Sequence, residues 1–237
     1  MNKSVYERLK KKANIPEEYF SYKISDYNFN DKNKKPDLKK TKALKTIVDY
    51  CDNFDENFKN GKGMYIYGPA KSHLGITLLG TFILRQGLNK CKKCKFVEFP
   101  TFLINISSYS DEFKVEETNE YYTTDILMID SINAFQYLNN TRVKTMFADI
   151  VFQRRNNNKP IIFSSHCEPE MLSIMYCDTL TNFVESHCGV VDLSIPSIRM
   201  ITLVEARSRL DNFARHDPGR DMQRYHIEEI SKIILDH

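Results

Sequence analysis

The sequence predicts an α/β protein with a parallel sheet flanked by helices. Short apolar runs rich in β-forming residues alternate with longer segments whose apolar residues recur at helical spacing. The run at 126–130 is apolar up to its final Asp, which is typical of a parallel strand buried on both faces. Such alternation of strands and helices predicts parallel connections. The expected strands are residues 64–67, 95–99, 126–130, 161–165 and 190–193.

The helices between these strands are predicted from apolar spacing and from turn residues. The helix after the first strand should begin near Ser72 and end before Gly87, because glycine often follows a helix C-terminus. A Lys-rich piece at 32–42 reads as an exposed linker, and 108–123 as a loop or irregular helix. The other expected helices are 1–14, 39–58, 102–107, 141–155 and 220–235.

Three segments are expected along the chain. Residues 1–42 form an N-terminal helical and irregular segment, residues 43–200 form the α/β core, and residues 201–237 form an Arg-rich helical tail. Tyr and Phe side chains at 19–29 are candidates for contact with a protein partner. The alternative is that these aromatic side chains hold the N-terminal segment on the core.

Composition indicates a soluble protein from a reducing cytoplasm. The 237 residues are 41% hydrophobic and 27% charged, with no apolar run of membrane-spanning length and no signal peptide. The six cysteines follow no secreted disulfide framework. Cys91 and Cys94 have metal-ligand spacing, but one such pair is half of a zinc site, so no zinc is expected. A membrane is not expected as a partner.

Positive charge is concentrated at the front of the chain. Residues 1–62 hold 15 Lys and Arg against 10 Asp and Glu, whereas the remainder holds 19 against 21. Such a bias permits contact with nucleic acid, and a solvated face is the alternative. Two candidate DNA paths are the Arg-rich tail and a set within 141–159, namely Arg142, Lys144, Arg154, Arg155 and Lys159.

The loop after the first strand stands where a phosphate-binding P-loop would lie. That motif, Gly-x-x-x-x-Gly-Lys-[Ser/Thr], wraps backbone N–H groups around a phosphate, while its Lys reaches the outer phosphates and its hydroxyl holds Mg²⁺. Gly68 lies three positions before Lys71, where the motif requires six, and Ala70 replaces the second Gly. Without a gap, Leu74 takes the Lys position. The alternative to a nucleotide site is an ordinary strand-to-helix turn. The candidate nucleotide-binding residues of this loop are Gly68, Pro69, Ala70, Lys71 and Ser72.

Polar residues end the third and fourth expected strands. Asp130 takes the Walker B position, where an Asp holds the metal of a bound nucleotide, although an Asp that caps the next helix is the alternative. The next residue is Ser131, and a hydroxyl of ordinary pKa is a poor general base for activating water. Ser164, Ser165 and His166 end the fourth strand, where a polar side chain could sense a γ-phosphate.

Together these pieces resemble the AAA+ core of the DnaC/DnaI-type helicase loaders, with IstB-type transposition ATPases as relatives. The resemblance spans roughly residues 13–200 and rests on segments 13–19, 54–63, 65–69, 71–74, 96–100, 126–130, 159–165 and 197–199. It implies sheet order 5-1-4-3-2, ATP or ADP with Mg²⁺ as ligand, and a nucleotide-binding role for Arg199. It also implies a ring-forming switch that binds single-stranded DNA and places the replicative helicase on it.

The chain departs from this family at several functional positions. The loop is short, Ser131 replaces the second acid, and His166 stands where the family usually has Asn. The family's trans-acting Arg should fall near 178–182, where this sequence has none. Each of these groups positions or stabilises transition-state charge, so ATP hydrolysis should be weak or absent.

We therefore consider three alternative functions. The first is a DNA replication accessory protein, encoded by a phage or mobile element, with a degenerate ATP site. It would act by binding replicative helicase, another AAA+ loader or initiator subunit, or single-stranded DNA. The second is an active ATPase loader or transposition helper in which Lys71, Ser72 and Asp130 keep their usual roles. The third is an inhibitor or decoy of a host AAA+ replication protein.

Overall fold

The computed structural model describes residues 3–24, 27, 38–68, 75–108, 112–132 and 141–194. Most of the predicted phosphate loop lies outside these residues, as do Arg199, the predicted helix at 220–235 and the tail from 201 onward. None of the helices in the described part is both long and apolar enough to cross a membrane.

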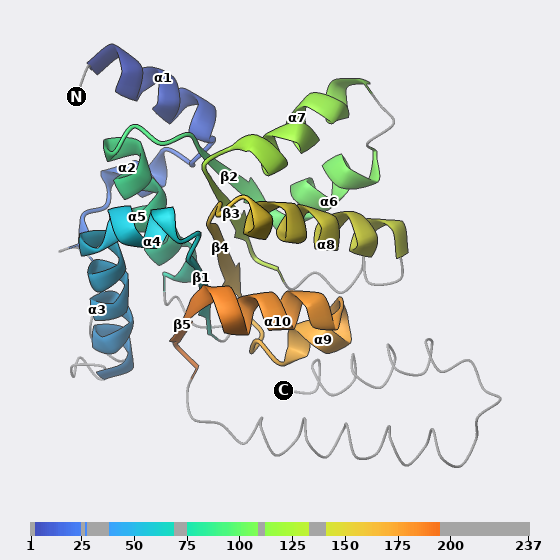
Figure 1. Ribbon diagram of the computed structural model, residues 1–237. Coiled ribbons are helices and arrows are strands. Elements are labelled where there is room, and N and C mark those ends of the chain that lie inside the picture. Colours follow the sequence, from blue (N-terminus) through green and yellow to red (C-terminus); the bar gives the residue numbers. More distant parts are fainter. Residues whose placement is uncertain are drawn as a thin grey trace. The chain divides into compact units, whose positions relative to one another are not determined.

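Within the described part, five parallel strands form one sheet in the order β2-β3-β4-β1-β5 (Figure 1). This is the predicted order, read from the other side, and each strand lies within two residues of its predicted bounds. The three inner strands, β1, β3 and β4, are almost completely buried, as their continuous apolar runs require. The strands are β1 (Gly63–Tyr67), β2 (Cys94–Glu98), β3 (Ile126–Asp130), β4 (Ile161–Ser165) and β5 (Cys188–Asp192).

Helices cover both faces of the sheet. On one face α5 (Ile76–Asn89) packs across β1 to β4, with α1 (Lys3–Ala13) beside β2 and α3 (Leu38–Asp52) beside β5. On the other face, α6 (Phe99–Ser107) and α10 (Asp178–His187) contact the strands, and α8 (Thr141–Asn156) packs against both of these helices (Figure 1). The remaining helices are α2 (Glu18–Ser21), α4 (Phe54–Lys59), α7 (Glu112–Thr123) and α9 (Met171–Met175).

Three predicted boundaries were wrong. Residues 38–42 belong to α3 and not to a linker, and the single helix expected at 39–58 is two helices, α3 and α4. Gly87 does not end its helix but lies inside α5. A Cβ atom there would come within 2.7 Å of Ile126 Cδ1 and 2.8 Å of Cys94 Sγ. Gly87 therefore allows close helix–sheet packing.

Arg154 is buried in the layer between α8 and the sheet. Its side chain has no exposed surface, and its guanidinium donates to four backbone carbonyl oxygens, at 2.8 to 3.2 Å. The acceptors belong to Tyr121 in the last turn of α7, to Thr124 and Asp125 just before β3, and to Pro160 just before β4. This side chain thus ties together two loops at the amino edge of the sheet.

Candidate functional site

The carboxyl ends of β3, β4 and β1 bring the predicted strand-end residues together. Because these three strands are neighbours in the sheet, Asp130, Ser164 to His166, and Gly68 share one edge. In open parallel sheets, ligands bind at this edge. The predicted strand-end residues therefore lie together at one edge of the sheet.

The Asp130 carboxylate is held by two serine hydroxyls. Ser164 Oγ donates to Asp130 Oδ1 at 2.5 Å and accepts the backbone N–H of Ser131 at 2.8 Å. Ser131 Oγ donates to the other carboxylate oxygen at 3.3 Å. Asp130 is 8% exposed and Ser164 is 2% exposed. Both oxygens that would approach a metal ion thus already accept hydrogen bonds from the chain itself.

Ser131 has an unusual backbone conformation for a side-chain-bearing residue. Its φ angle is +62°, in the left-handed region where residues other than glycine are strained. The hydrogen bond from its N–H to Ser164 and the bond from Ile132 N–H to the Ser164 carbonyl, at 3.0 Å, hold the chain in this turn. Strain of this kind is concentrated at functional sites.

His166 links β4 to the start of the loop after β1. Its Nδ1 lies 3.1 Å from the Gly68 carbonyl oxygen. A carbonyl oxygen accepts but does not donate, so Nδ1 carries the hydrogen and, in the neutral ring, Nε2 is left as an acceptor. The Gly68 N–H in turn donates to the Ser165 carbonyl at 3.2 Å. His166 therefore positions Gly68, which would begin a phosphate loop.

Two further side chains, which no sequence pattern placed in the site, reach this edge. The hydroxyl of Tyr19, from α2, hydrogen-bonds the side chain of Thr77 in the first turn of α5. Burial raises the pKa of Tyr19, and the negative charge of Asp130 raises it further. Thr77 could have been noticed, since a hydroxyl in this turn follows the loop. Tyr19 could not, because the contact joins segments far apart in the sequence.

The donor set suits magnesium in its chemistry. A carboxylate and hydroxyl oxygens are hard ligands of the kind that Mg²⁺ prefers. However, the described part of the chain contains no group of three or more His, Cys, Asp and Glu side chains arranged as a metal site. If Mg²⁺ with a nucleotide bound here, Asp130 would be its protein ligand, and the Ser164 or Ser131 hydroxyl would have to release one carboxylate oxygen.

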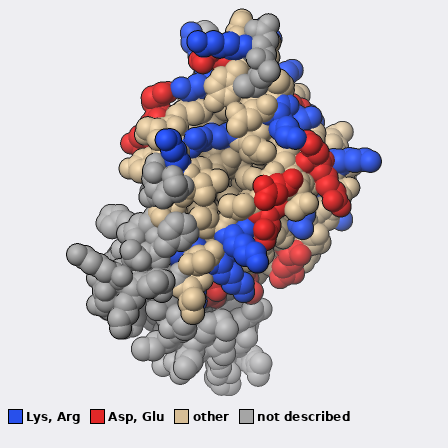
Figure 2. Space-filling model, turned by 90° about the vertical axis from the view of Figure 1, so that its left-hand side faces the viewer, with Lys and Arg blue, Asp and Glu red and all other residues tan. Residues whose placement is uncertain are grey.

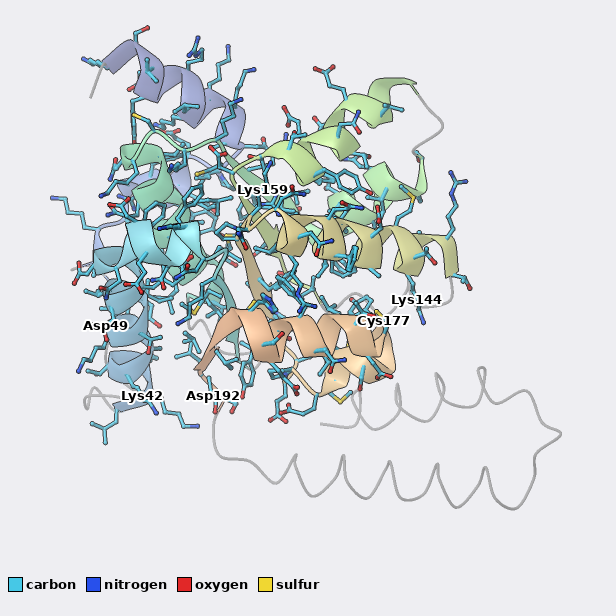
Figure 3. The ribbon with its side chains drawn as sticks, in the orientation of Figure 1. Lys42, Asp49, Lys144, Lys159, Cys177 and Asp192 are labelled. Carbon is cyan, nitrogen blue, oxygen red and sulfur yellow. The ribbon has the colours of Figure 1, made fainter. Side chains whose placement is uncertain are left out.

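The predicted DNA path along 141–159 is not one surface. Arg154 is buried, as described above. Lys159 donates to the Thr123 carbonyl at 2.5 Å, near the amino edge of the sheet. Arg142 and Lys144 lie in the first turn of α8, about 20 and 16 Å from Arg155 at 1.5 Å per residue. Figure 3 shows Lys144 and Lys159 at opposite ends of this helix.

The Cys91–Cys94 pair does not present two ligands to solvent. Cys91 is exposed, but Cys94 is buried, and its thiol donates to the Leu84 carbonyl at 3.4 Å. Burial also raises the pKa of Cys94, which opposes formation of the thiolate that binds metals. All six cysteines are free thiols.

Of the N-terminal aromatic side chains, Tyr19, Phe20 and Tyr27 pack on the core, whereas Tyr22 is exposed and Phe29 lies outside the described residues. Tyr19 and Phe20 are half-buried against the core, and Tyr27 is 5% exposed. Arg85 of α5 holds this segment by donating to the Tyr19 and Tyr22 carbonyls, at 3.1 and 2.5 Å. The alternative interpretation, in which the aromatic side chains anchor the segment, fits these contacts better than a partner-binding role.

Comparison with solved structures supports the resemblance at the level of fold. A crystal structure of the DnaC helicase loader matches with a TM-score of 0.63 and 17% identity over 76% of this chain and 99% of that chain. A crystal structure of DnaI matches with a TM-score of 0.59 and 16% identity over 75% of this chain and 94% of that one.

The replication initiator DnaA shares the fold over part of its length. The AMPPCP-bound DnaA from Aquifex aeolicus matches with a TM-score of 0.55 and 19% identity over 73% of this chain and 50% of that chain. No family model matches the sequence, and no curated protein matches it. The AAA+ fold predicted from the sequence is thus confirmed.

Proposed function

We propose that this chain is a DNA replication accessory protein built on the helicase-loader fold, acting in the cytoplasm by binding rather than by ATP turnover. Its partner would be the replicative helicase, another AAA+ loader or initiator subunit, or single-stranded DNA. The fold match supports the functional class, because it spans nearly the whole of the DnaC and DnaI chains. The state of Asp130 supports the mode of action.

The observation that carries the proposal is the pair of serine hydroxyls on the Asp130 carboxylate. A Walker B Asp must hold the metal of the nucleotide, and an adjacent base must orient the attacking water. Here the carboxylate has protein partners on both oxygens, and its neighbour Ser131 lacks a suitable pKa for a base. The site can therefore be stable without metal, which is expected of a degenerate nucleotide site.

The first prediction concerns ATP turnover. We expect steady-state hydrolysis about 100-fold or more below the 1–10³ s⁻¹ range of typical enzymes, because metal binding and water activation are both impaired. Phosphate release from Mg²⁺-ATP measures it, with the Asp130→Asn variant as the control for contaminating ATPase. Turnover at ordinary rates that Asp130→Asn abolishes would instead establish the active ATPase loader.

Nucleotide binding is tested separately from turnover. A ligand that binds the folded state must raise the melting temperature, so Mg²⁺-ATP is expected to shift it little or not at all. Ser164→Ala frees one Asp130 oxygen for a metal ion. If the hydroxyls compete with metal, Ser164→Ala should show a larger Mg²⁺-ATP shift than the unaltered chain.

The direction of the effect on a helicase separates a loader from an inhibitor. Co-elution with purified replicative helicases and AAA+ loaders would identify the partner. Loading of that helicase on single-stranded circles would then be measured with and without this protein. Increased loading supports the accessory role, and decreased loading supports the inhibitor or decoy.

A further inference from the structure

The parallel sheet separates charge between its two edges. The last residues of β2, β3 and β5 at the carboxyl edge are Glu98, Asp130 and Asp192. Glu98 and Asp130 are paired in register, so two acids lie side by side there. At the amino edge, Lys93 and Lys62 directly precede β2 and β1, Lys159 lies two residues before β4, and Asp125 and His187 precede β3 and β5. The two edges therefore differ in the sign of the charge that they attract.

The amino edge carries its basic residues in a row. In the spatial order of the strands, the flanking residues are Lys93 before β2, Asp125 before β3, Lys159 beside β4, Lys62 before β1 and His187 before β5. Neighbouring strands lie about 4.8 Å apart, so this row is about 19 Å long. We call it the amino-edge row.

Contacts between the loops confirm that the row is continuous. The backbone N–H of Lys93 donates to Oδ2 of Asp125, the one acid in the row, at 2.7 Å. Lys159 donates to the carbonyl of Thr123, the last residue of α7, which leads into β3. Gly61 lies against Asn158, since a Cβ on that glycine would be 2.7 Å from Asn158 Cα. The loops before β1 to β4 thus form one surface.

Further basic side chains flank the row. Arg155 Nε donates to His187 Nε2 at 3.1 Å. The imidazole at the end of the row therefore carries no hydrogen on Nε2, and it lies beside the Arg155 cation. Lys90 pairs with Asp55 at 2.7 Å. Lys92 lies over the Phe58 ring. Exposed Lys59 and the exposed amides of Asn60, Asn89 and Asn156 add donors for phosphate or base oxygens.

Most cations of this edge have no carboxylate partner among the residues that the structure describes. Lys90 is the exception, through Asp55. On the face seen in Figure 2, basic and acidic side chains are interspersed. An excess of cations, together with exposed amides, is typical of a surface that binds a phosphodiester backbone.

We propose that the amino-edge row is a binding surface for the backbone of single-stranded DNA, on the opposite edge of the sheet from the candidate nucleotide site. The choice of single-stranded DNA as ligand rests on the proposed function. A single strand is also favoured by width, because the row follows one line across the strand ends, as a single phosphate backbone does. Binding on this edge requires no nucleotide.

The test removes exposed charges from the row and from its flank, and it leaves the row's hydrogen-bonded Lys159 unchanged. The variant Lys59→Gln, Lys62→Gln, Lys93→Gln spares Lys159, whose ammonium donates to backbone carbonyls. The matched control removes three exposed lysines from other elements, as Lys11→Gln, Lys42→Gln, Lys45→Gln. Figure 3 shows Lys42 on α3, well away from Lys159. Thermal unfolding confirms that both triple variants fold.

Binding is measured by anisotropy of a labelled 20-nucleotide oligo(dT) at several salt concentrations. We expect the row variant to bind at least tenfold more weakly than the unaltered chain. Its plot of log K against log salt should be flatter by about 2, since each phosphate contact on a single strand contributes about 0.7 to the slope. The control variant should change the affinity less than twofold.

Four results would overturn the proposal. In the first two, the unaltered chain does not bind oligo(dT) at low salt, or the two triple variants lose the same affinity for it. In the other two, the chain binds a duplex of the same length more tightly, or it binds anionic lipid vesicles through the row and does not bind oligo(dT). If one of these results occurs while the unaltered chain still co-elutes with a helicase or AAA+ partner, the proposed function stands and this surface fails. If the unaltered chain co-elutes with no such partner but its oligo(dT) binding depends on the row, the surface stands and the helicase-binding part of the proposed function fails.

Discussion

At the scale of single residues, Arg154 shows how an interior position can be mistaken for a functional one. From the sequence it belonged to a basic group that could line DNA. Yet Phe147, Ile150, Val151 and Arg154 are spaced as one helix face, and all four are buried. Burial lowers the pKa of its guanidinium to about 9, so at neutral pH the charge is retained and held by carbonyl dipoles.

We predict that Arg154→Lys destabilises the protein by about 2–4 kcal/mol, although the charge is unchanged. A lysine ammonium cannot reach the four carbonyls that the planar guanidinium bridges, and buried acceptors would lose their donors. The midpoint of urea unfolding measures the change. Arg155→Lys, at an exposed neighbour, should stay within about 0.5 kcal/mol. Similar losses for both would contradict the structural role of Arg154.

The main site residues were more accessible to sequence reasoning than Arg154. Asp130, Ser164 and His166 each follow an apolar strand, and parallel strands place such residues at one edge. Sequence could not show that Ser164 bonds the Asp130 carboxylate or that His166 bonds Gly68. These contacts depend on side-chain rotamers and on the turn at Ser131, whose positive φ angle no sequence pattern predicts.

At the scale of elements, periodicity predicted the strands well and some helix boundaries badly. The apolar positions from Leu44 to Phe58 keep helical spacing across the break between α3 and α4, so the pattern cannot show it. Gly87 looked like a helix end because glycine is usual there, but tertiary packing of α5 on β2 and β3 determined its position. Glycine marks both turns and close approaches, and sequence alone does not separate them.

Gly63 and Gly189 give a matched test of close packing between strands. A Cβ on Gly63 would lie 2.2 Å from the backbone carbonyl oxygen of Ile161, whereas one on Gly189 would meet the flexible Met64 side chain at 3.1 Å. Gly63→Ala must therefore shift a strand backbone, and we expect a loss of about 2–3 kcal/mol, or roughly 5–10 °C in melting temperature.

Gly189→Ala should be nearly neutral, because Met64 can move and alanine is favoured over glycine within a strand. Differential scanning calorimetry of the two variants provides the comparison. If Gly189→Ala were as damaging as Gly63→Ala, backbone contact between β1 and β4 could not be the reason.

At the scale of the whole molecule, the sheet gives the chain two chemically different edges. The acidic carboxyl edge holds the candidate nucleotide site, and the basic amino edge carries the proposed DNA surface. The fold is thus shared with AAA+ replication proteins, while the side chains at the nucleotide edge depart from what ATP turnover requires. A protein of this kind should assemble by partner contacts rather than by nucleotide.

The resemblance to helicase loaders implies that ATP lies between subunits, with an Arg of one subunit reaching the phosphate of the next. In this chain the expected Arg region, 178–182, falls in the first turn of α10, which contains no Arg. On the other side of such a joint, Asp130 is engaged by Ser164 and Ser131. Both sides of a nucleotide-dependent subunit contact are thus altered. Added ATP therefore has little difference in affinity between the assembled and unassembled states with which to drive assembly.

We therefore expect a monomer or small oligomer whose mass, by light scattering, is the same with and without Mg²⁺-ATP. Asp130→Asn should leave that mass unchanged, whereas a ring of five or six subunits that forms with ATP alone and is lost in Asp130→Asn would show that the joint still works.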